Sequence, residues 1–258
     1  MTLALLDLPS PIFDALDAAL ESAYLPTLAR VALYACACAF VGMRLYRRHS
    51  DQAALGVLRD EIARTQRALA LHEGGFGELH ALIRRNLALS IRQLGMTLKP
   101  ALIASLPLLF VMPWLSNRFG IEAPAPGTHV AACARPAEAA QGLRWEPAAA
   151  APRDGCWQLA WPADDAHLKL EDAQGTLLFA VPAAPRSDIV HKFIFLNWLV
   201  GNPDGYLPDS APLDALTLAL PQRALVPLGP AWLRGWEPWY FGILLIVSVA
   251  LKLRWNVN

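Results

Sequence analysis

Arg30 is the residue whose type and place most strongly suggest a chemical role. It lies in the apolar run 25–46, where a charge is costly, so an ionisable residue there is a functional hypothesis by default. Two interpretations stay open. Arg30 is close to one end of the run and can reach the lipid headgroups, or it lines a polar groove within the membrane. Thr27, Ser105 and Ser248 are the other polar residues in or near the apolar runs, and they complete the predicted polar groove.

The chain shows no pattern typical of covalent, metal or nucleotide chemistry. The six histidines are scattered, and none of them has a second histidine at i+3 or i+4. The sequence lacks Gly-x-Ser-x-Gly and His-Glu-x-x-His, and Gly-Gly-Phe-Gly at 74–77 lacks the Lys-Ser/Thr of a phosphate loop, so we interpret it as a turn. Asp164 and Asp165 are adjacent carboxylates, but they fall in a predicted turn, where Asp is common for backbone reasons. We therefore expect no enzyme, no metal and no cofactor.

Composition favours a membrane protein with a substantial water-soluble part. Of the 258 residues, 55% are hydrophobic and only 17% are charged, whereas soluble domains are nearer a quarter charged. The 22 basic and 22 acidic residues cancel, which removes the electrostatic case for nucleic-acid binding. No small-molecule substrate is indicated either.

Three apolar segments are predicted to span the membrane: residues 25–46, 100–118 and 236–258, the last including the C-terminus. About twenty apolar residues cross the ~30 Å hydrocarbon core. Basic residues follow the first span, precede the second and end the third, so all fall on one side if the N-terminus is outside and the C-terminus inside. They are Arg44, Arg47, Arg48, Arg84, Arg85, Arg92, Lys99, Lys252 and Arg254. The localisation expected is the bacterial inner membrane, as a multi-pass protein.

Residues 1–24 are expected to contain a short amphipathic helix on the outer leaflet. Ser10-Pro11 is a favourable N-cap and first-turn pair. Ile12, Phe13, Leu16, Leu20 and Tyr24 then form one face, and Asp14, Asp17 and Glu21 form the other. The alternative is a plain lead-in turn of the first span.

Residues 47–99 are expected to form a cytoplasmic antiparallel helical hairpin. The first arm has apolar positions at the 3-4 spacing of a coiled-coil seam: Leu55, Leu58, Ile62, Thr65 and Leu69. Gly74, Gly75 and Gly77 are expected to end the helix of the first arm. The second arm carries its own stripe: Leu79, Ile83, Leu87, Ile91 and Leu94.

Residues 119–235 are expected to fold outside as a small α+β domain, mainly β. Alternating apolar runs predict strands at 128–134, 156–161, 167–171, 176–181 and 215–220. Ser187 is predicted to cap a helix over 188–200 that ends at Gly201. Cys133 and Cys156 both lie in this domain, and an oxidising compartment permits a disulfide between them, but the sequence does not give their distance.

This order of elements resembles the YidC/Oxa membrane-insertase superfamily. It is most similar to the three-span branch that includes archaeal YidC-like proteins and the insertase subunit of the endoplasmic-reticulum membrane protein complex. The local similarity lies at residues 98–115, with a Lys-Pro-x-Leu-Ile start, a central Pro and a Trp-Leu end, and at residues 232–240 before the third span. The outer domain is far longer than the loop usual in that branch.

The resemblance implies a membrane α-helical fold and a non-covalent function in membrane-protein biogenesis. In this superfamily a basic residue in a water-filled groove attracts a polar segment of the client, and the cytoplasmic hairpin captures it. The expected partners are the lipid bilayer and membrane-protein clients. The alternative is an accessory or scaffold subunit of a larger membrane complex, which docks a partner through its outer domain.

Overall fold

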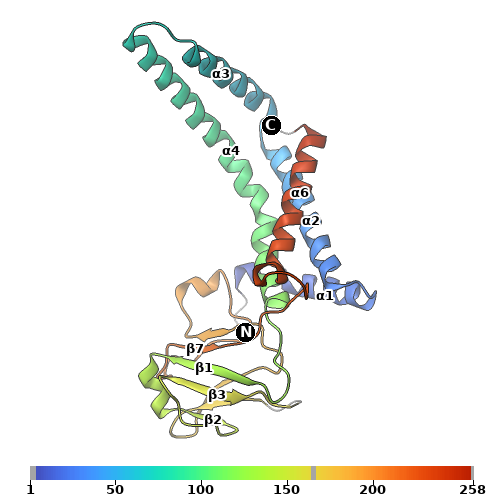
Figure 1. The fold of residues 1–258 in the computed structure, drawn as a ribbon, viewed down its shortest axis with the longest axis vertical. Helices are drawn as coiled ribbons and strands as arrows, with labels where there is room; N and C mark the ends of the chain where they lie inside the picture. Colours follow the sequence, from blue (N-terminus) through green and yellow to red (C-terminus); the bar gives the residue numbers. More distant parts are fainter. Residues whose placement is uncertain (1–3, 164–166, 257–258) are drawn as a thin grey trace. The chain divides into compact units, whose positions relative to one another are not determined.

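The structure, a computed structural model, describes residues 4–163 and 167–256 (Figure 1). Asp164 and Asp165 lie outside these residues. The chain divides into two compact units. The first comprises Met1–Arg30 and Phe110–Trp239, and the second comprises Val31–Leu109 and Tyr240–Asn258. Each is described by itself below.

Three helices are long and apolar enough to cross a membrane, in agreement with the three predicted spans. They are α2 (Thr27–His49), α4 (Phe76–Phe119) and α6 (Glu237–Trp255). Helix α4 is continuous through Pro100, Pro107 and Pro113, so it contains both the second arm of the hairpin and the second predicted span. The chain is therefore a membrane protein by the length and composition of these helices.

A stripe of small residues on α2 shapes the packing of the second unit. Ala35, Cys38 and Ala39 on this helix are buried. A β-carbon added at Gly42 would lie 3.0 Å from the backbone oxygen of Ala104, so α2 and α4 approach closely here. Small residues at such crossings let helix backbones meet without a hydrophobic driving force, as membrane helices require.

The hairpin of the second unit is formed by α3 (Gln52–Ala70) and the first part of α4. Asp51 caps α3 by accepting a hydrogen bond from the backbone N–H of Ala54 at 3.0 Å. Four of the five predicted seam positions of this arm are buried: Leu55, Leu58, Ile62 and Thr65. A hydrogen bond from Arg85 on α4 lowers the pKa of Glu61 on α3, and their atoms are 2.8 Å apart.

The predicted stripe of the second arm does not pack in the hairpin. Leu89 on α4 is the residue that joins Leu58 and Ile62 in their common cluster, with Met96 packed against it. The predicted positions Ile83, Leu87, Ile91 and Leu94 are instead 49–65% exposed. The sequence contained two possible faces on this arm, and the more apolar one is left uncovered.

The first unit contains two antiparallel sheets. One has the order β3-β1-β7-β6 and the other β2-β4-β5. The strands are β1 (His129–Arg135), β2 (Arg144–Glu146), β3 (Cys156–Ala160), β4 (Lys169–Glu171), β5 (Leu177–Ala180), β6 (Ile189–His191) and β7 (Ala215–Leu218). The remaining elements are the 3₁₀ helices η1 (Leu5–Asp7), η2 (Ala137–Gly142) and η3 (Phe195–Trp198), with α1 (Ser10–Ser22) and the short α5 (Ala231–Arg234).

Both sheets contribute to one hydrophobic core. Strand β1 alternates buried and more exposed positions along its length, the period of two that the sequence shows. Trp157 on β3 meets Trp145 on β2 edge to face, with ring centroids 6.0 Å apart, so the aromatic contact joins the two sheets. All the buried members of this core cluster lie between Val130 and Leu218.

The helix predicted over residues 188–200 is wrong. The segment forms strand β6, which pairs with β7, and then the short 3₁₀ helix η3. The side chain of Ser187 accepts from the N–H of Ile189 at 3.2 Å and donates to its carbonyl oxygen at 2.8 Å, rather than capping a helix. Ile189 and Val190 are β-branched and favour a strand, and the free edge of β7 provides their partner.

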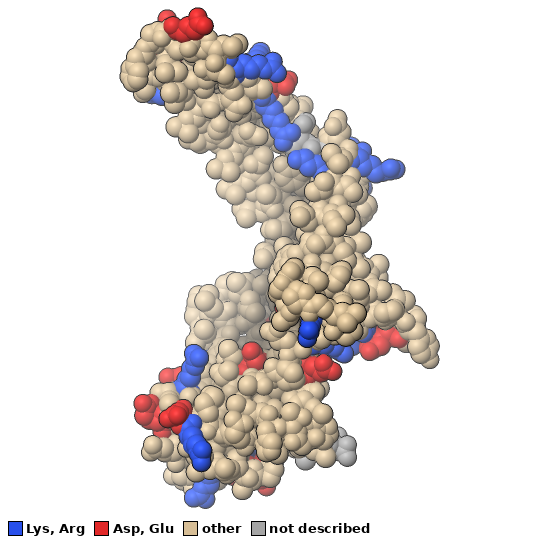
Figure 2. Space-filling model, in the orientation of Figure 1, with Lys and Arg blue, Asp and Glu red and all other residues tan. Residues whose placement is uncertain are grey.

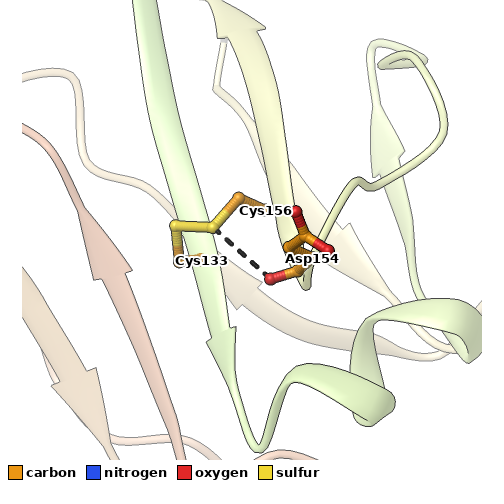
Figure 3. The surroundings of a disulfide bond; sticks show 3 residues. All are labelled: Cys133, Asp154 and Cys156. Carbon is orange, nitrogen blue, oxygen red and sulfur yellow. Dashed lines mark hydrogen bonds between the residues drawn. A yellow bond between two sulfur atoms is a disulfide. The ribbon is translucent and has the colours of Figure 1, made fainter.

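The structure contains the disulfide between Cys133 and Cys156 (Figure 3). The two residues are opposite one another in the register of β1 and β3, so strand pairing alone brings them together. The sequence permitted this bond without supplying the distance, and the antiparallel register supplies it.

We expect residues 119–235, expressed alone in an oxidising compartment, to unfold cooperatively, because the core of the two sheets lies wholly within them. Replacing both cysteines by serine should lower the free energy of unfolding by about 3 kcal/mol, the effect of freeing a loop of this length. Thermal melting with and without reductant measures this. A non-cooperative melt of the oxidised fragment would contradict the domain assignment.

Candidate functional site

Arg30 is buried beside a carboxylate in the first unit. Its Nη1 lies 2.8 Å from Oδ2 of Asp17 on α1, and the side chains of Arg30 and Asp17 are 4% and 0% exposed. Arg118, near the end of α4, binds the same oxygen through its Nε, also at 2.8 Å. One carboxylate oxygen of α1 thus joins the beginning of α2 to the end of α4.

Further contacts surround this pair. Glu21 lies 3.4 Å from Arg30 and 2.9 Å from Arg118, and it is itself 56% exposed. Thr27 accepts a hydrogen bond from Nη2 of Arg30 at 3.4 Å. The guanidinium also lies 5.6 Å from the ring centroid of Phe119, within cation–π range. We call Asp17, Glu21, Thr27, Arg30 and Arg118 the charged cluster.

A second contact attaches α1 to α4. The indole N–H of Trp114 donates to Oδ1 of Asp14 at 2.8 Å. The ring centroids of Phe13 and Trp114 lie 5.4 Å apart. Both contacts belong to the first unit and fix one side of α1.

Helix α1 is amphipathic as predicted, and its acidic face contacts the protein together with Phe13 from the apolar face. Asp17 is fully buried, whereas Ile12 and Leu16 are 69% and 50% exposed. The helix begins at Ser10 after Pro9, so Ser10 is not the cap that the sequence suggested. The outward apolar face suits a helix that lies in a membrane interface.

The energy of the charged cluster depends on its being complete. Two charges withdrawn from water are costly unless they are paired, and removing one partner of a buried pair typically costs about 3–5 kcal/mol. The sequence pattern assigned Asp17 to the polar face of the amphipathic helix and did not indicate Arg118 as a site residue. The sequence signal that could have found this cluster is the group of acidic residues on α1, which has no basic residue beside it in the same helix.

The four residues of the predicted groove form two groups in different units. Thr27 and Arg30 belong to the charged cluster. Ser105 and Ser248 line a cavity of about 260 Å³ in the second unit. The rest of its wall comes from α2, α4 and α6, and is mostly apolar: Cys38, Ala39, Gly42, Met43, Tyr46, Ala101, Ala104, Leu108 and Leu244. The hydroxyl of Ser105 donates to the carbonyl of Leu102 at 2.8 Å, which leaves the cavity weakly polar.

An exposed apolar stripe extends along α4 from the hairpin into the span. Its members follow one another at intervals of three or four residues, which keeps them on one side of a helix. We call the following residues, all 45–65% exposed, the α4 stripe: Ile83, Leu87, Ile91, Leu94, Leu98, Leu102, Leu106 and Leu109. In Figure 2 the charged side chains seen on the second unit lie over the hairpin and near the end of α6, and the intervening surface is uncharged.

A larger cavity, of about 630 Å³, lies in the first unit near two aspartates. Asp204 accepts hydrogen bonds from the backbone N–H groups of Arg186 and Ser187, and Asp7 accepts one from Gly201. Burial raises the pKa of both carboxyls, and these hydrogen bonds oppose the rise. Each carboxylate has a backbone partner that explains its place, so we regard the pair as structural.

No group of three His, Cys, Asp or Glu side chains suited to a metal ion occurs within residues 4–163 and 167–256. The structure offers, among these residues, a charged cluster, a small cavity between helices and an apolar stripe. Comparisons of the chain with known protein families, with curated proteins and with solved structures found no match in any of the three.

Proposed function

We propose that this protein is a membrane-protein biogenesis factor of insertase type, which holds apolar client segments without covalent chemistry. The observation that carries the proposal is the α4 stripe. A continuous apolar surface that extends from a charged hairpin into a membrane span gives a client segment a path between water and lipid.

The exposure of the α4 stripe supports this role. A soluble hairpin buries its apolar side chains, since each one left in water forfeits about 1.5–3 kcal/mol. Here Leu89 packs inside the hairpin while Leu87 and Ile91 point outward. Contiguous exposed apolar surface of this kind marks a site of interaction.

The cavity lined by Ser105 and Ser248 is a second supporting feature. Its walls come from all three apolar helices, and it lies in the same unit as the α4 stripe. In the proposed mechanism the stripe receives an apolar segment, and the two hydroxyls lower the cost of admitting a polar group of the client into the cavity.

Arg30 has a positioning role in this mechanism. Its charge is balanced by Asp17 and Glu21, so it does not present a free cation to a client. It holds α1 against the beginning of α2 instead. The order of the elements supports the resemblance to the YidC/Oxa superfamily, and the positioning role proposed for Arg30 replaces the client-attracting role that the resemblance implies.

We further propose the bacterial inner membrane, with the N-terminus outside and the C-terminus inside. Basic residues at the ends of α2 and α6 favour this orientation. The disulfide of the sheet domain favours an oxidising compartment for that domain.

A cysteine placed at Asp60 in α3 should resist a membrane-impermeant maleimide added to intact cells and should react after lysis, because α3 is expected to be cytoplasmic. The control is a cysteine at Gln174 in the sheet domain, which should react in intact cells. Both need Cys36 and Cys38 replaced by alanine. Labelling at Asp60 before lysis would overturn the orientation.

A photo-crosslinker at Leu87 or Leu94 should capture many different nascent membrane proteins, whereas one at Arg92, on another side of the same helix, should capture few. Replacing Leu87, Ile91 and Leu94 together by glutamine should reduce client insertion while thermal stability stays the same, because these side chains are exposed. Leu71→Gln, at a leucine that is 81% exposed and lies outside the stripe, is the control.

Two outcomes would contradict this proposal. Capture of one stable partner in place of many clients would favour the accessory-subunit function. Unchanged insertion by the triple glutamine variant would show that the hairpin part of the α4 stripe does not bind clients.

A further inference from the structure

The loop 193–200 of the first unit exposes a dense group of large apolar side chains. Phe195 and Leu196 in η3 are 80% and 64% exposed, and Ile194 is 54% exposed. Phe193, Trp198 and Val200 are each 43–49% exposed. The segment contains no charged residue. Strand β6, which precedes the loop, is paired with β7, so the exposure belongs to the loop and not to the strand before it.

The polar residue of this loop is turned inward. Asn197 is 7% exposed. Its Oδ1 accepts from the N–H of Ile194 at 2.8 Å, and its Nδ2 donates to the carbonyl of Val200 at 3.2 Å. Asn197 therefore satisfies backbone groups at both ends of the turn. This is the arrangement that irregular backbone needs in order to enter a medium without water.

The loop is fastened to the N-terminal segment. The N–H of Leu6 donates to the carbonyl of Leu199 at 3.0 Å. The N–H of Gly201 donates to Oδ2 of Asp7 at 3.1 Å. A β-carbon at Gly201 would lie 2.6 Å from that oxygen, so a larger residue here would displace the Asp7 carboxylate. Two hydrogen bonds thus connect residues 193–201 to η1.

The N-terminal segment is in turn held close to a membrane span. Helix α1 ends at Ser22 and the apolar helix α2 begins at Thr27. The residues between these two helix ends can span at most about 17 Å when fully extended. Leu5, Leu8 and Ile12 along this segment are 43–69% exposed. The apolar loop is therefore hydrogen-bonded to a segment that also exposes apolar side chains and that leads directly into the apolar helix α2.

We propose that the loop 193–200 inserts into the outer leaflet of the bilayer and anchors the sheet domain to the lipid surface. Phe, Trp, Leu and Ile are the side chains that bind the interface between headgroups and acyl chains. Lys192 directly precedes the loop and forms an ion pair with Asp214 at 3.0 Å. The first charged residues thus lie at the boundary of the proposed inserted segment. The proposal depends on α2 being a span and, for the choice of leaflet, on the orientation proposed above, and it is independent of the insertase function.

The test uses the full chain, with Cys36 and Cys38 replaced by alanine, in vesicles of phosphatidylcholine and phosphatidylglycerol. Phe195→Cys carries an environment-sensitive fluorophore, and Leu196→Cys is a second reporter position. Gln174→Cys, in an exposed turn of the same unit, is the matched control. The vesicles contain lipids with a nitroxide quencher at a shallow position on the acyl chain.

We expect emission at Phe195→Cys and Leu196→Cys to shift to the blue and to fall about twofold with the quencher lipid, as for an interfacial segment. Gln174→Cys should show neither change. Emission typical of water at both loop positions would overturn the proposal. So would a blue shift without quenching, which would show that a protein partner or a second copy of this chain covers the loop.

Discussion

The Asp17 carboxylate, buried between Arg30 and Arg118, is the interaction on which the arrangement of the first unit depends. Three chain segments meet at one oxygen: α1 supplies the acid, the beginning of α2 supplies one base, and the end of α4 supplies the other. A guanidinium at the end of a membrane span needs a partner or water. Here the amphipathic helix supplies the partner, and this turns the acidic face of α1 inward.

The charged cluster bears on the function proposed above. Because the charge of Arg30 is balanced by Asp17 and Glu21, the proposal does not rely on attraction of a client by a fixed positive charge. It relies instead on apolar contact with the exposed leucines and isoleucines of α4, with Ser105 and Ser248 as the hydroxyls that would admit polar groups. Helix α1 and the loop 193–200 show a related arrangement, with Asp17 and Asn197 buried and neighbouring apolar side chains exposed. The α4 stripe, α1 and the loop thus all expose apolar side chains.

The sequence predicted the elements that have a strong period or composition. Alternation indicated β1, β3 and β7 because one face of each strand enters the core, and the apolar runs indicated α2, α4 and α6. It misassigned residues 188–200, since Ile189 and Val190 pair with Thr217 and Leu216, which are far along the chain. It also selected Ile83 and Leu87 as a buried face, because periodicity shows that a face is apolar without showing what covers it. Arg30 was found from its cost in the membrane, while Asp17 and Arg118 depend on tertiary contacts.

The most direct test of the central claim is a double-mutant cycle between Asp17→Asn and Arg30→Gln, measured as the free energy of unfolding of the full chain in mild detergent. A buried, mutually dependent pair predicts that each single substitution costs about 3–5 kcal/mol. It also predicts that the double substitution costs less than the sum, with a coupling energy of about 1–3 kcal/mol. Strictly additive costs, or single substitutions without effect, would show that Asp17 does not hold Arg30 and would contradict this account.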